Sequence, residues 1–592
     1  MINHTDTWAV PPVPDYVTGA EKQLWPFSGE CGAERKWRHD ILPRIPGRFA
    51  GQLADLYEED WPKPNGRFRA NTRLRKAATE LCPPGVVLSE DTDDLRRIAK
   101  LKAGNARWVS ARHETAEARY RCLCGYAKES GILPAEPSTK SGLDGANLRM
   151  CDERWWRRRL KRAESRAIES AAIEIGLVHK KREIYVSNEN LLRRREQQRQ
   201  TRNLMETLQV VNELGEAFNL QEVIDGSLSN PVLRRNELMA RIVGCEHYSK
   251  QNSYEALFLT LTCPSRFHAR YGKSGDPNPQ YDGSRPNDGQ AYLNRLWSRA
   301  RAALDRQGIE IFGIRIAEPH HDGTPHWHIL VFVRHGQAES MISTLEHYAL
   351  QDSPDEPGAK QRRFKVEKID PAKGTAIGYV AKYISKNVDG YGIEADESGL
   401  EAPKVAERVK AWSTAWGIRQ FQFFGGPPVS IWRELRLLRD EVANPEIEAA
   451  RQAADQGEWA AFIEVMGGMN CSSKDRPITL AKVWSDRPNS YDEPIGEVVF
   501  GVRVGDAVIQ TRLHIWKVES VNKSAKNEAE ARCSIHERIK SDLSLDRILF
   551  GEWLNLINMK GRAPITWSSV NNCTEIPITV GEIPFYCFFK GG

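Results

Sequence analysis

The segment from Ile311 to Val333, which reads IFGIRIAEPHHDGTPHWHILVFV, constrains the fold more strongly than any other part of the chain. Two apolar runs, Ile311–Ala317 and Ile329–Val333, flank a stretch of Pro, His, Asp and Gly. This pattern predicts a β-hairpin with a long loop. Because side chains alternate between the two faces of a strand, His326 and His328 should project from the same face of the second strand.

A carboxylate completes a candidate metal site on this hairpin. If the strands pair around the loop Pro319–Pro325, Glu318 lies opposite His326 and faces the same side. Two imidazoles and one carboxylate can hold a divalent ion with positions left open for water or substrate. The alternative is that the histidines are ordinary hydrogen-bonded strand residues. His320 or His321 could also replace Glu318 as third ligand, although we interpret both as DNA-facing or structural.

If the substrate is a phosphoester, Mg²⁺ or Mn²⁺ is the expected ion, because such a substrate needs open coordination positions and oxygen ligands. Of the two, Mn²⁺ tolerates imidazole ligands more readily. A separate zinc site is conceivable at Cys122, Cys124 and Cys151, with His113 nearby. These cysteines lack the paired CxxC spacing of most zinc sites, so we interpret them as buried structural thiols.

A second constellation lies further along the chain, in the segment GYVAKYISKNV. Tyr379 and Tyr383 are one helical turn apart and would share one face of a helix, and Lys382 and Lys386 repeat this spacing on the neighbouring face. Beside a metal, a tyrosine oxygen can attack a phosphodiester while a lysine offsets the charge that develops in the transition state. Without the histidine pair, two core-facing aromatics on an amphipathic helix would be the preferred interpretation.

These residues match two motifs of a known superfamily. His326-Trp327-His328 matches the HUH motif (His, bulky apolar, His), and the segment from Tyr379 to Tyr383 matches the two-tyrosine motif of HUH endonucleases. The wider contexts, AEPHHDGTPHWHILVF and YVAKYISKN, closely resemble the bacteriophage replication gene A protein (GPA) family, which contains the rolling-circle replication initiators of tailed and small isometric phages.

Flanking sequence extends the resemblance in both directions. The run Ala256–Thr262, followed by Cys-Pro-Ser, looks like the family's first motif, and WGIRQFQFFGGPPVSIWRELR from Trp416 also looks like family sequence. The resemblance therefore covers roughly residues 230–440 well and the flanks poorly.

The resemblance implies a metal-dependent endonuclease that nicks and rejoins one DNA strand at a replication origin. Tyr379 or Tyr383 would attack the phosphate and form a 5′-phosphotyrosyl link, leaving a 3′-OH that primes synthesis, and the other tyrosine would cleave the regenerated site. Lys382 and Lys386 would assist as catalytic residues. No nucleotide cofactor is needed, because the phosphotyrosyl bond conserves the energy.

Origin DNA, single-stranded or as melted duplex, is the expected partner. The chain contains no P-loop motif, so unwinding and synthesis would need a host replicative helicase of the Rep type and a host polymerase. Three alternatives remain open. The chain could be a non-catalytic origin-binding or packaging protein, a relaxase or transposase of the HUH superfamily, or an HxH metal hydrolase that acts on small phosphoesters.

We predict an α+β fold in three parts, because 592 residues are enough for several domains. Residues 1–224 should form a mostly helical, basic region that binds DNA. Residues 225–445 should form the HUH endonuclease domain, an antiparallel sheet with helices packed on one face. Residues 446–592 should form a β-rich region of unknown role.

Within the first part, helices are expected over residues 92–118 and 205–218. Basic side chains gather in residues 154–162 beside Trp155 and Trp156, and arginines with aromatics available for stacking are typical of nucleic-acid contacts. The alternative is a solvated helix of mixed charge, since glutamates interleave further along.

Composition indicates a soluble globular protein, because 40% of the residues are hydrophobic and 28% are charged. No apolar run is long enough to cross a membrane, and the N-terminal sequence has no signal-peptide pattern. The eleven cysteines are scattered without a disulfide framework. We therefore expect the cytoplasm of the host cell as the compartment, with no membrane partner.

Overall fold

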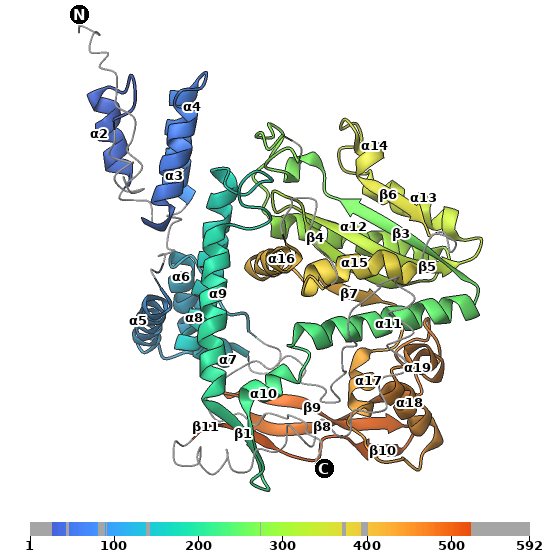
Figure 1. The fold of residues 1–592 in the computed structure, drawn as a ribbon. Helices are drawn as coiled ribbons and strands as arrows, with labels where there is room; N and C mark the ends of the chain where they lie inside the picture. Colours follow the sequence, from blue (N-terminus) through green and yellow to red (C-terminus); the bar gives the residue numbers. More distant parts are fainter. Residues whose placement is uncertain are drawn as a thin grey trace, which may run out of the picture.

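The computed structural model describes residues 26–42, 47–80, 89, 91–137, 142–272, 274–369, 375–391 and 401–521. Helices and strands are mixed, as an α+β fold requires (Figure 1). One five-stranded sheet and two three-stranded sheets make up the β-structure of these residues. No helix in the described part of the chain combines the length and the apolar character that crossing a membrane requires.

The five-stranded sheet carries the segment that dominates the sequence. Its strand order is β6-β3-β5-β4-β7, and every neighbouring pair is antiparallel, as predicted. Strands β4 and β5 form the expected hairpin, in which Pro319 pairs with Pro325 beside the loop. The strands are β3 (Tyr254–Thr262), β4 (Ile311–Pro319), β5 (Pro325–Arg334), β6 (Phe364–Lys368) and β7 (Phe421–Phe424).

Helices cover both faces of this sheet, so the prediction that they lie on one face was wrong. Leu259 and Ile329 pack against α12, α13 and α16 on one face, whereas Phe258 and Leu330 pack against α11 and α15 on the other. The reason is that β4 and most of β5 are buried on both sides, which requires a packing partner for each face. The helices are α11 (Pro231–Gln251), α12 (Pro286–Arg306), α13 (Ala338–Ala349), α15 (Ala376–Val388) and α16 (Ala402–Trp416).

The described residues before 207 are mostly helical, as predicted. Thr115 accepts a hydrogen bond from the backbone N–H of Ala118 and so caps a new helix. The single helix expected over residues 92–118 is therefore two. The helices of this part are α2 (Gly32–Ile41), α3 (Gly47–Asp60), α4 (Gly66–Glu80), α5 (Thr92–Ser110), α6 (Ala116–Glu129), α7 (Gly142–Met150), α8 (Glu153–Glu174) and α9 (Asn188–Glu206).

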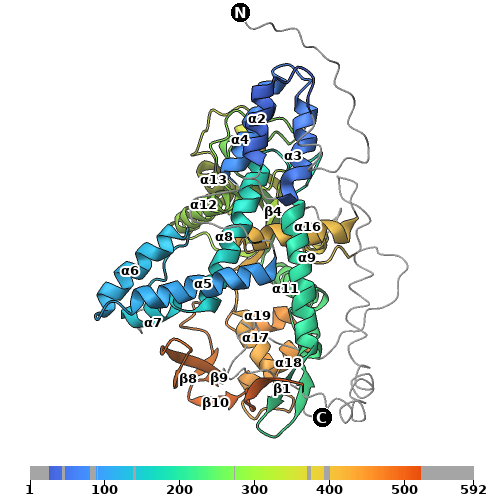
Figure 2. The same cartoon turned by 90° about the vertical axis from the view of Figure 1, so that its left-hand side faces the viewer.

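Helices α5, α6 and α7 form a lobe that projects from the side of the molecule, together with the start of α8 (Figure 2). Trp155 and Trp156 lie in the core of this lobe, where they are 3% and 0% exposed and pack edge to face with ring centroids 5.1 Å apart. They cannot stack on nucleic acid, contrary to the sequence-based interpretation. Arg157 and Arg158 on the same helix are exposed.

One of the two small sheets joins segments that are far apart in the sequence. The helix expected over residues 205–218 is wrong, because Leu208–Asn212 forms β1, which pairs with β11 and β2. Val210 and Val211 suit a strand, but the pairing partner that decides the outcome lies near the other end of the chain. The strands are β1 (Leu208–Asn212), β2 (Ala217–Asn219) and β11 (Trp516–Ser520) in one sheet and β8 (Ile478–Pro488), β9 (Pro494–Val504) and β10 (Ala507–Gln510) in the other.

The remaining helices are short and mostly connect these units. They are α10 (Leu220–Asp225), α14 (Ala359–Arg362), α17 (Val429–Leu435), α18 (Pro445–Gln456), α19 (Trp459–Val465) and the 3₁₀-helix Ser265–Phe267. Because α18 and α19 pack into the same core as α11 and α15, contacts cross the boundary predicted near residue 445. The three-part division remains a prediction.

Candidate metal and nuclease site

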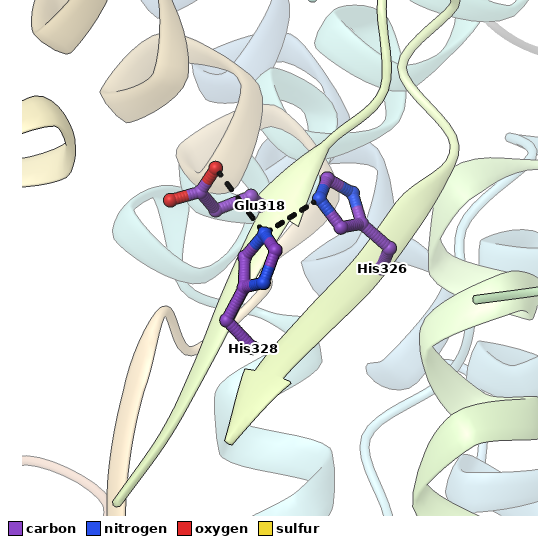
Figure 3. A group of neighbouring side chains, drawn as sticks. All are labelled: Glu318, His326 and His328. Carbon is purple, nitrogen blue, oxygen red and sulfur yellow. Dashed lines mark hydrogen bonds and ion pairs between the residues drawn. The ribbon is translucent and has the colours of Figure 1, made fainter. Parts of the chain in front are cut away.

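Glu318, His326 and His328 converge at the loop end of the β4–β5 hairpin (Figure 3). Glu318 pairs with His326 in the antiparallel register, so the register predicted from the sequence is confirmed. The Nε2 atoms of His326 and His328 are 3.0 Å apart, and His328 Nε2 is 4.0 Å from a Glu318 carboxylate oxygen. One ligand atom from each residue lies within 4.8 Å of the others.

Neighbouring strands fix the orientation of His328. Thr260 on β3 pairs directly with His328, and its hydroxyl lies 3.1 Å from His328 Nδ1. With Nδ1 engaged by Thr260, Nε2 faces Glu318 and His326. A hydrogen bond to the outer ring nitrogen is the usual means by which proteins orient a metal-binding histidine.

Burial keeps both imidazoles neutral. Burial and the neighbouring His320 and His328 rings hold the pKa of His326 well below its usual value. Burial also lowers the pKa of His328, against the opposing effect of Glu318. A neutral imidazole offers the lone pair that a metal ion requires, so the electrostatic environment suits ligation.

Helix α15 supplies the two partners of the Glu318 carboxylate, which is only 2% exposed. Asn387 donates a hydrogen bond from Nδ2 to one carboxylate oxygen, and Lys386 Nζ lies 3.5 Å from the other. A buried carboxylate is costly unless such partners compensate it. The two residues therefore compensate the buried carboxylate and hold its oxygens near the histidines.

The two tyrosines lie on the face of α15 that packs against the sheet. Thr375 caps the start of this helix, and Val380 and Ile384 anchor it in the core. The Tyr383 ring lies 4.1 Å from the His328 ring, centroid to centroid, and 5.2 Å from Phe258. Tyr379, one turn earlier, lies 6.1 Å from Phe258. Tyr383 is thus in direct contact with the histidine pair.

Lys382 and Lys386, to which the sequence analysis gave the same role, lie in different surroundings in the structure. Lys386 is half-buried beside Glu318, as described above. Lys382 is exposed, and no hydrogen bond or ion pair joins it to another residue in the described ranges. Of the predicted site residues, Glu318, His326, His328, Tyr383 and Lys386 come together, Tyr379 lies one turn away, and Lys382 points elsewhere.

Sequence reasoning missed two residues that position the site. Asn387 lies four residues after Tyr383, so the tyrosine spacing continued by one more turn would have indicated it. Thr260 lies in the strand that was recognised, but only the register of β3 against β5 brings it to His328.

The loop histidines His320 and His321 lie next to the site and make ring contacts there. His320 packs against His326, with ring centroids 4.1 Å apart, and His321 stacks on Tyr185. Burial lowers the pKa of His320 to about 3. His268 lies 3.1 Å from the buried Asp322 carboxylate, next to His320. Both loop histidines are therefore packed into the structure around the site.

The donor set fits a divalent ion. Two imidazole nitrogens and one carboxylate oxygen that approach one point are suitable ligands for Mn²⁺ and acceptable ones for Mg²⁺. This triad is the single such group of three or more potential ligands in the described part of the chain, and Cys122, Cys124 and Cys151 are not in it.

Comparison with known proteins identifies relatives of this chain. The replication gene A protein of Escherichia phage 186 is 40% identical over 442 residues, which are 72% of this chain and 59% of that protein. The probable replication protein P12 of Pseudoalteromonas phage PM2 is 39% identical over 381 residues, 63% of this chain and 59% of that protein.

A probable replication endonuclease from a prophage-like region of Salmonella paratyphi A is 36% identical over 389 residues, 62% of this chain and 48% of that protein. The chain thus spans about half to three fifths of the length of these relatives. No solved structure matches the chain.

A family model described as bacteriophage replication gene A protein (GPA) matches residues 99–391. This match begins well before residue 230, where the resemblance seen in the sequence was expected to start, so helices α5–α9 are family sequence as well. The chain belongs to the bacteriophage replication gene A protein family.

Proposed function

We propose that this protein initiates phage DNA replication as a metal-dependent, site-specific endonuclease that nicks and rejoins one strand of the origin through a phosphotyrosyl intermediate. The observation that carries the proposal is the contact between Tyr383 and His328, whose ring centroids are 4.1 Å apart at the triad of potential metal ligands. The names of the relatives, which include replication proteins and probable replication endonucleases, support the same activity.

Glu318, His326 and His328 would hold the ion. A bound Mg²⁺ or Mn²⁺ would polarise the scissile phosphate and offset its charge. Tyr383 then attacks phosphorus through its hydroxyl oxygen, whose proton is lost to water. The new bond joins tyrosine to phosphorus, and the bond from phosphorus to the 3′-oxygen breaks. That oxygen takes up a proton and becomes a free 3′-OH, so no nucleotide cofactor is consumed.

Lys386 has a second role in this scheme. Its ammonium lies beside Glu318 and would therefore be near a phosphate bound at the triad. It offsets negative charge on the phosphoryl oxygens as the new bond forms. Lys382, which is exposed, would contact the DNA strand outside the reacting centre.

Two tyrosines allow a second cleavage while the first remains covalently occupied. Tyr379 lies one turn from Tyr383 on the same face of α15. After one round of synthesis it would cleave the regenerated origin, and the released 3′-OH would attack the first phosphotyrosine and close a circle. Because Tyr383 contacts His328 and Tyr379 does not, Tyr383 is the nucleophile expected for the first nick.

The partners follow from this reaction. The substrate is origin DNA, single-stranded or melted, and a host helicase of the Rep type and a host polymerase would unwind and extend it. Residues 1–224 would bind origin duplex, for which exposed Arg157, Arg158 and Arg162 on α8 offer positive charge. Replacing these three arginines with glutamine should weaken binding of duplex origin and spare cleavage of a single-stranded oligonucleotide.

A denaturing-gel assay tests the proposed reaction. The substrate is single-stranded origin DNA from the replicon that encodes the protein, incubated with Mn²⁺ and wild type, Tyr379→Phe, Tyr383→Phe or the double variant. We expect a protein-linked 5′ product with wild type, a slower first nick with Tyr383→Phe than with Tyr379→Phe, and no adduct with the double variant.

Other outcomes would support the competing functions. Cleavage without an adduct in any variant would indicate a metal hydrolase in which the tyrosines are dispensable. Origin binding without cleavage would indicate a non-catalytic origin-binding protein. Joining to an unrelated acceptor strand, without circle closure, would indicate a relaxase or transposase of the same superfamily.

A further inference from the structure

A cavity of about 670 Å³ lies on the face of the central sheet opposite the triad. Side chains alternate along β4, so Glu318 faces α15 whereas Arg315 faces α12. Residues of β4, β7 and α12 line this cavity, and Arg315 forms part of its wall. None of the residues in the triad or on α15 lines it, so it is separate from the proposed nuclease site.

Arg315 is a buried cation held by neutral groups. It is 9% exposed, and its Nη2 donates hydrogen bonds to the amide oxygens of Asn294, at 2.9 Å, and Gln422. Its Cζ lies 3.9 Å from the centroid of the Trp327 ring. These contacts fix the position of the guanidinium group but supply no negative charge, and no hydrogen bond within the described residues uses its Nε or Nη1.

Two further arginines increase the positive charge. Arg301 on α12 also lines the cavity, and Arg419, just before β7, is close enough to act on Arg315. Both are exposed. Burial, followed by these two cations, lowers the pKa of Arg315 to about 10. In the described ranges, no carboxylate oxygen comes within 4.0 Å, the limit for an ion pair, of any of the three guanidinium groups.

Such an arrangement costs stability unless something outside the chain compensates it. A buried charge is normally paired, and three arginines with no acid among them repel one another. Planar guanidinium groups match the oxygens of a phosphate, which can accept two parallel hydrogen bonds from one arginine. The missing partner is therefore an anion, and a phosphate fits the donors best.

Amide groups next to the arginines narrow the ligand class. Asn294 and Gln422 line the same cavity, and their amides can contact a base edge. Trp297 and Phe424 also line it, but they are only 6% and 7% exposed and pack edge to face against each other, so they form an apolar wall and not a stacking surface. Arginines for a phosphate and amides for a base edge occur together where proteins bind nucleotides in single strands.

We propose that this cavity is a second nucleic-acid site, which binds a nucleotide phosphate of single-stranded DNA on the face of the sheet opposite the nuclease centre. The ligand is a nucleotide in either case, and the source we assign is a DNA strand and not a free nucleotide. That assignment rests on the proposed function, since an initiator must hold strand on both sides of its nick.

Binding measurements on the full chain test the proposal. The background is Tyr379→Phe/Tyr383→Phe, which cannot form the adduct, and the probes are a fluorescent oligothymidylate without origin sequence, thymidine monophosphate and inorganic phosphate. The cavity variant is Arg301→Gln/Arg419→Gln. The matched control is Arg295→Gln/Arg299→Gln, which removes two exposed arginines of α12 that do not line the cavity.

The cavity variant should bind oligothymidylate about tenfold more weakly than the control, as the loss of a hydrogen bond to a charged group predicts. The slope of log affinity against log salt should also become shallower, by about 0.7 for each lost phosphate contact. With 5-bromodeoxyuridine in the oligonucleotide, ultraviolet irradiation should crosslink it to the peptide that contains Trp297 or Phe424.

Equal weakening in the cavity and control variants would overturn the proposal, because it would reflect general positive charge. Loss of thymidine monophosphate binding with unchanged oligothymidylate binding would overturn the assignment to a strand. Loss of phosphate binding alone would reveal a simple anion site and would also overturn it. Failure of wild type to nick the origin would overturn the proposed function and leave these binding results standing.

Discussion

Replacing Asn387 with alanine should weaken the metal site without removing a ligand. Asn387 donates from Nδ2 to one oxygen of Glu318, and the remaining carboxylate partner is Lys386 at 3.5 Å. In Asn387→Ala the carboxylate loses its fixed orientation toward His326 and His328. The side chains of all three proposed ligands are unchanged, so any loss of affinity reports positioning.

The size of the effect follows from the bond that is lost. A hydrogen bond to a charged group contributes roughly 1.5–3 kcal/mol, and removing an outer partner of a metal ligand typically costs about 10–100-fold in affinity. Since Lys386 still neutralises Glu318 in the variant, we expect the lower part of this range, about a tenfold to thirtyfold weaker affinity for Mn²⁺.

Titration of Mn²⁺ followed by electron paramagnetic resonance measures this affinity directly. Ser385→Ala is the matched control, because Ser385 lies on the same helix and its side chain makes no hydrogen bond within the described residues. His328→Ala defines the affinity of a protein that lacks one ligand. Circular dichroism should show that Asn387→Ala remains folded. If the folded variant binds Mn²⁺ as tightly as wild type, Glu318 is not the third ligand and the reasoning fails.

Three further predictions concern the site and the sheet that carries it. Lys386→Met should slow nicking of single-stranded origin DNA by tenfold or more. Lys382→Met should have a much smaller effect, because only Lys386 lies beside Glu318. Equal nicking rates of the two variants in single-turnover assays would contradict this. The fold should lose stability as the pH falls from about 6.5, because His320 has a folded-state pKa of about 3 and takes up its proton only when the chain unfolds. Urea unfolding at several pH values should show a steeper loss in wild type than in His320→Gln, and parallel curves would argue against this origin. Gly313→Ala should destabilise the protein by more than about 3 kcal/mol, because an added Cβ would lie 2.0 Å from the Leu330 carbonyl oxygen. At Gly308 an added Cβ has free space, so Gly308→Ala should cost only about 1 kcal/mol for its left-handed backbone. Similar unfolding midpoints for the two variants would refute the comparison.

The hairpin was predictable because local rules determine it. Two apolar runs, a Pro- and Gly-containing loop and the period of two along a strand were enough to place Glu318 opposite His326, and the register confirms it. The tyrosine helix was predictable for the same reason, since a spacing of four residues and a Thr cap are properties of the local sequence.

Features that depend on tertiary contacts were not predictable in this way. Thr260 reaches His328 through the pairing of β3 with β5, and Asn387 reaches Glu318 through the packing of α15 on the sheet. The second covered face of the sheet and the burial of Trp155 depend on which helices return to pack there. Periodicity in a single segment does not contain that information.

The pairing of β1 with β11 has a consequence for synthesis of the protein. Residues that pair between the two strands are as much as 312 positions apart, as Leu208 and Ser520 are. During synthesis, β1 leaves the ribosome long before its partner strand β11, which lies near the end of the described chain. The pairing of β1 with β11 is therefore a late and slow step of folding. Until then β1 has an unpaired edge that carries apolar side chains, a form prone to association with other chains. A product terminated before Trp516 would contain every residue of the proposed catalytic centre and still lack a completed fold.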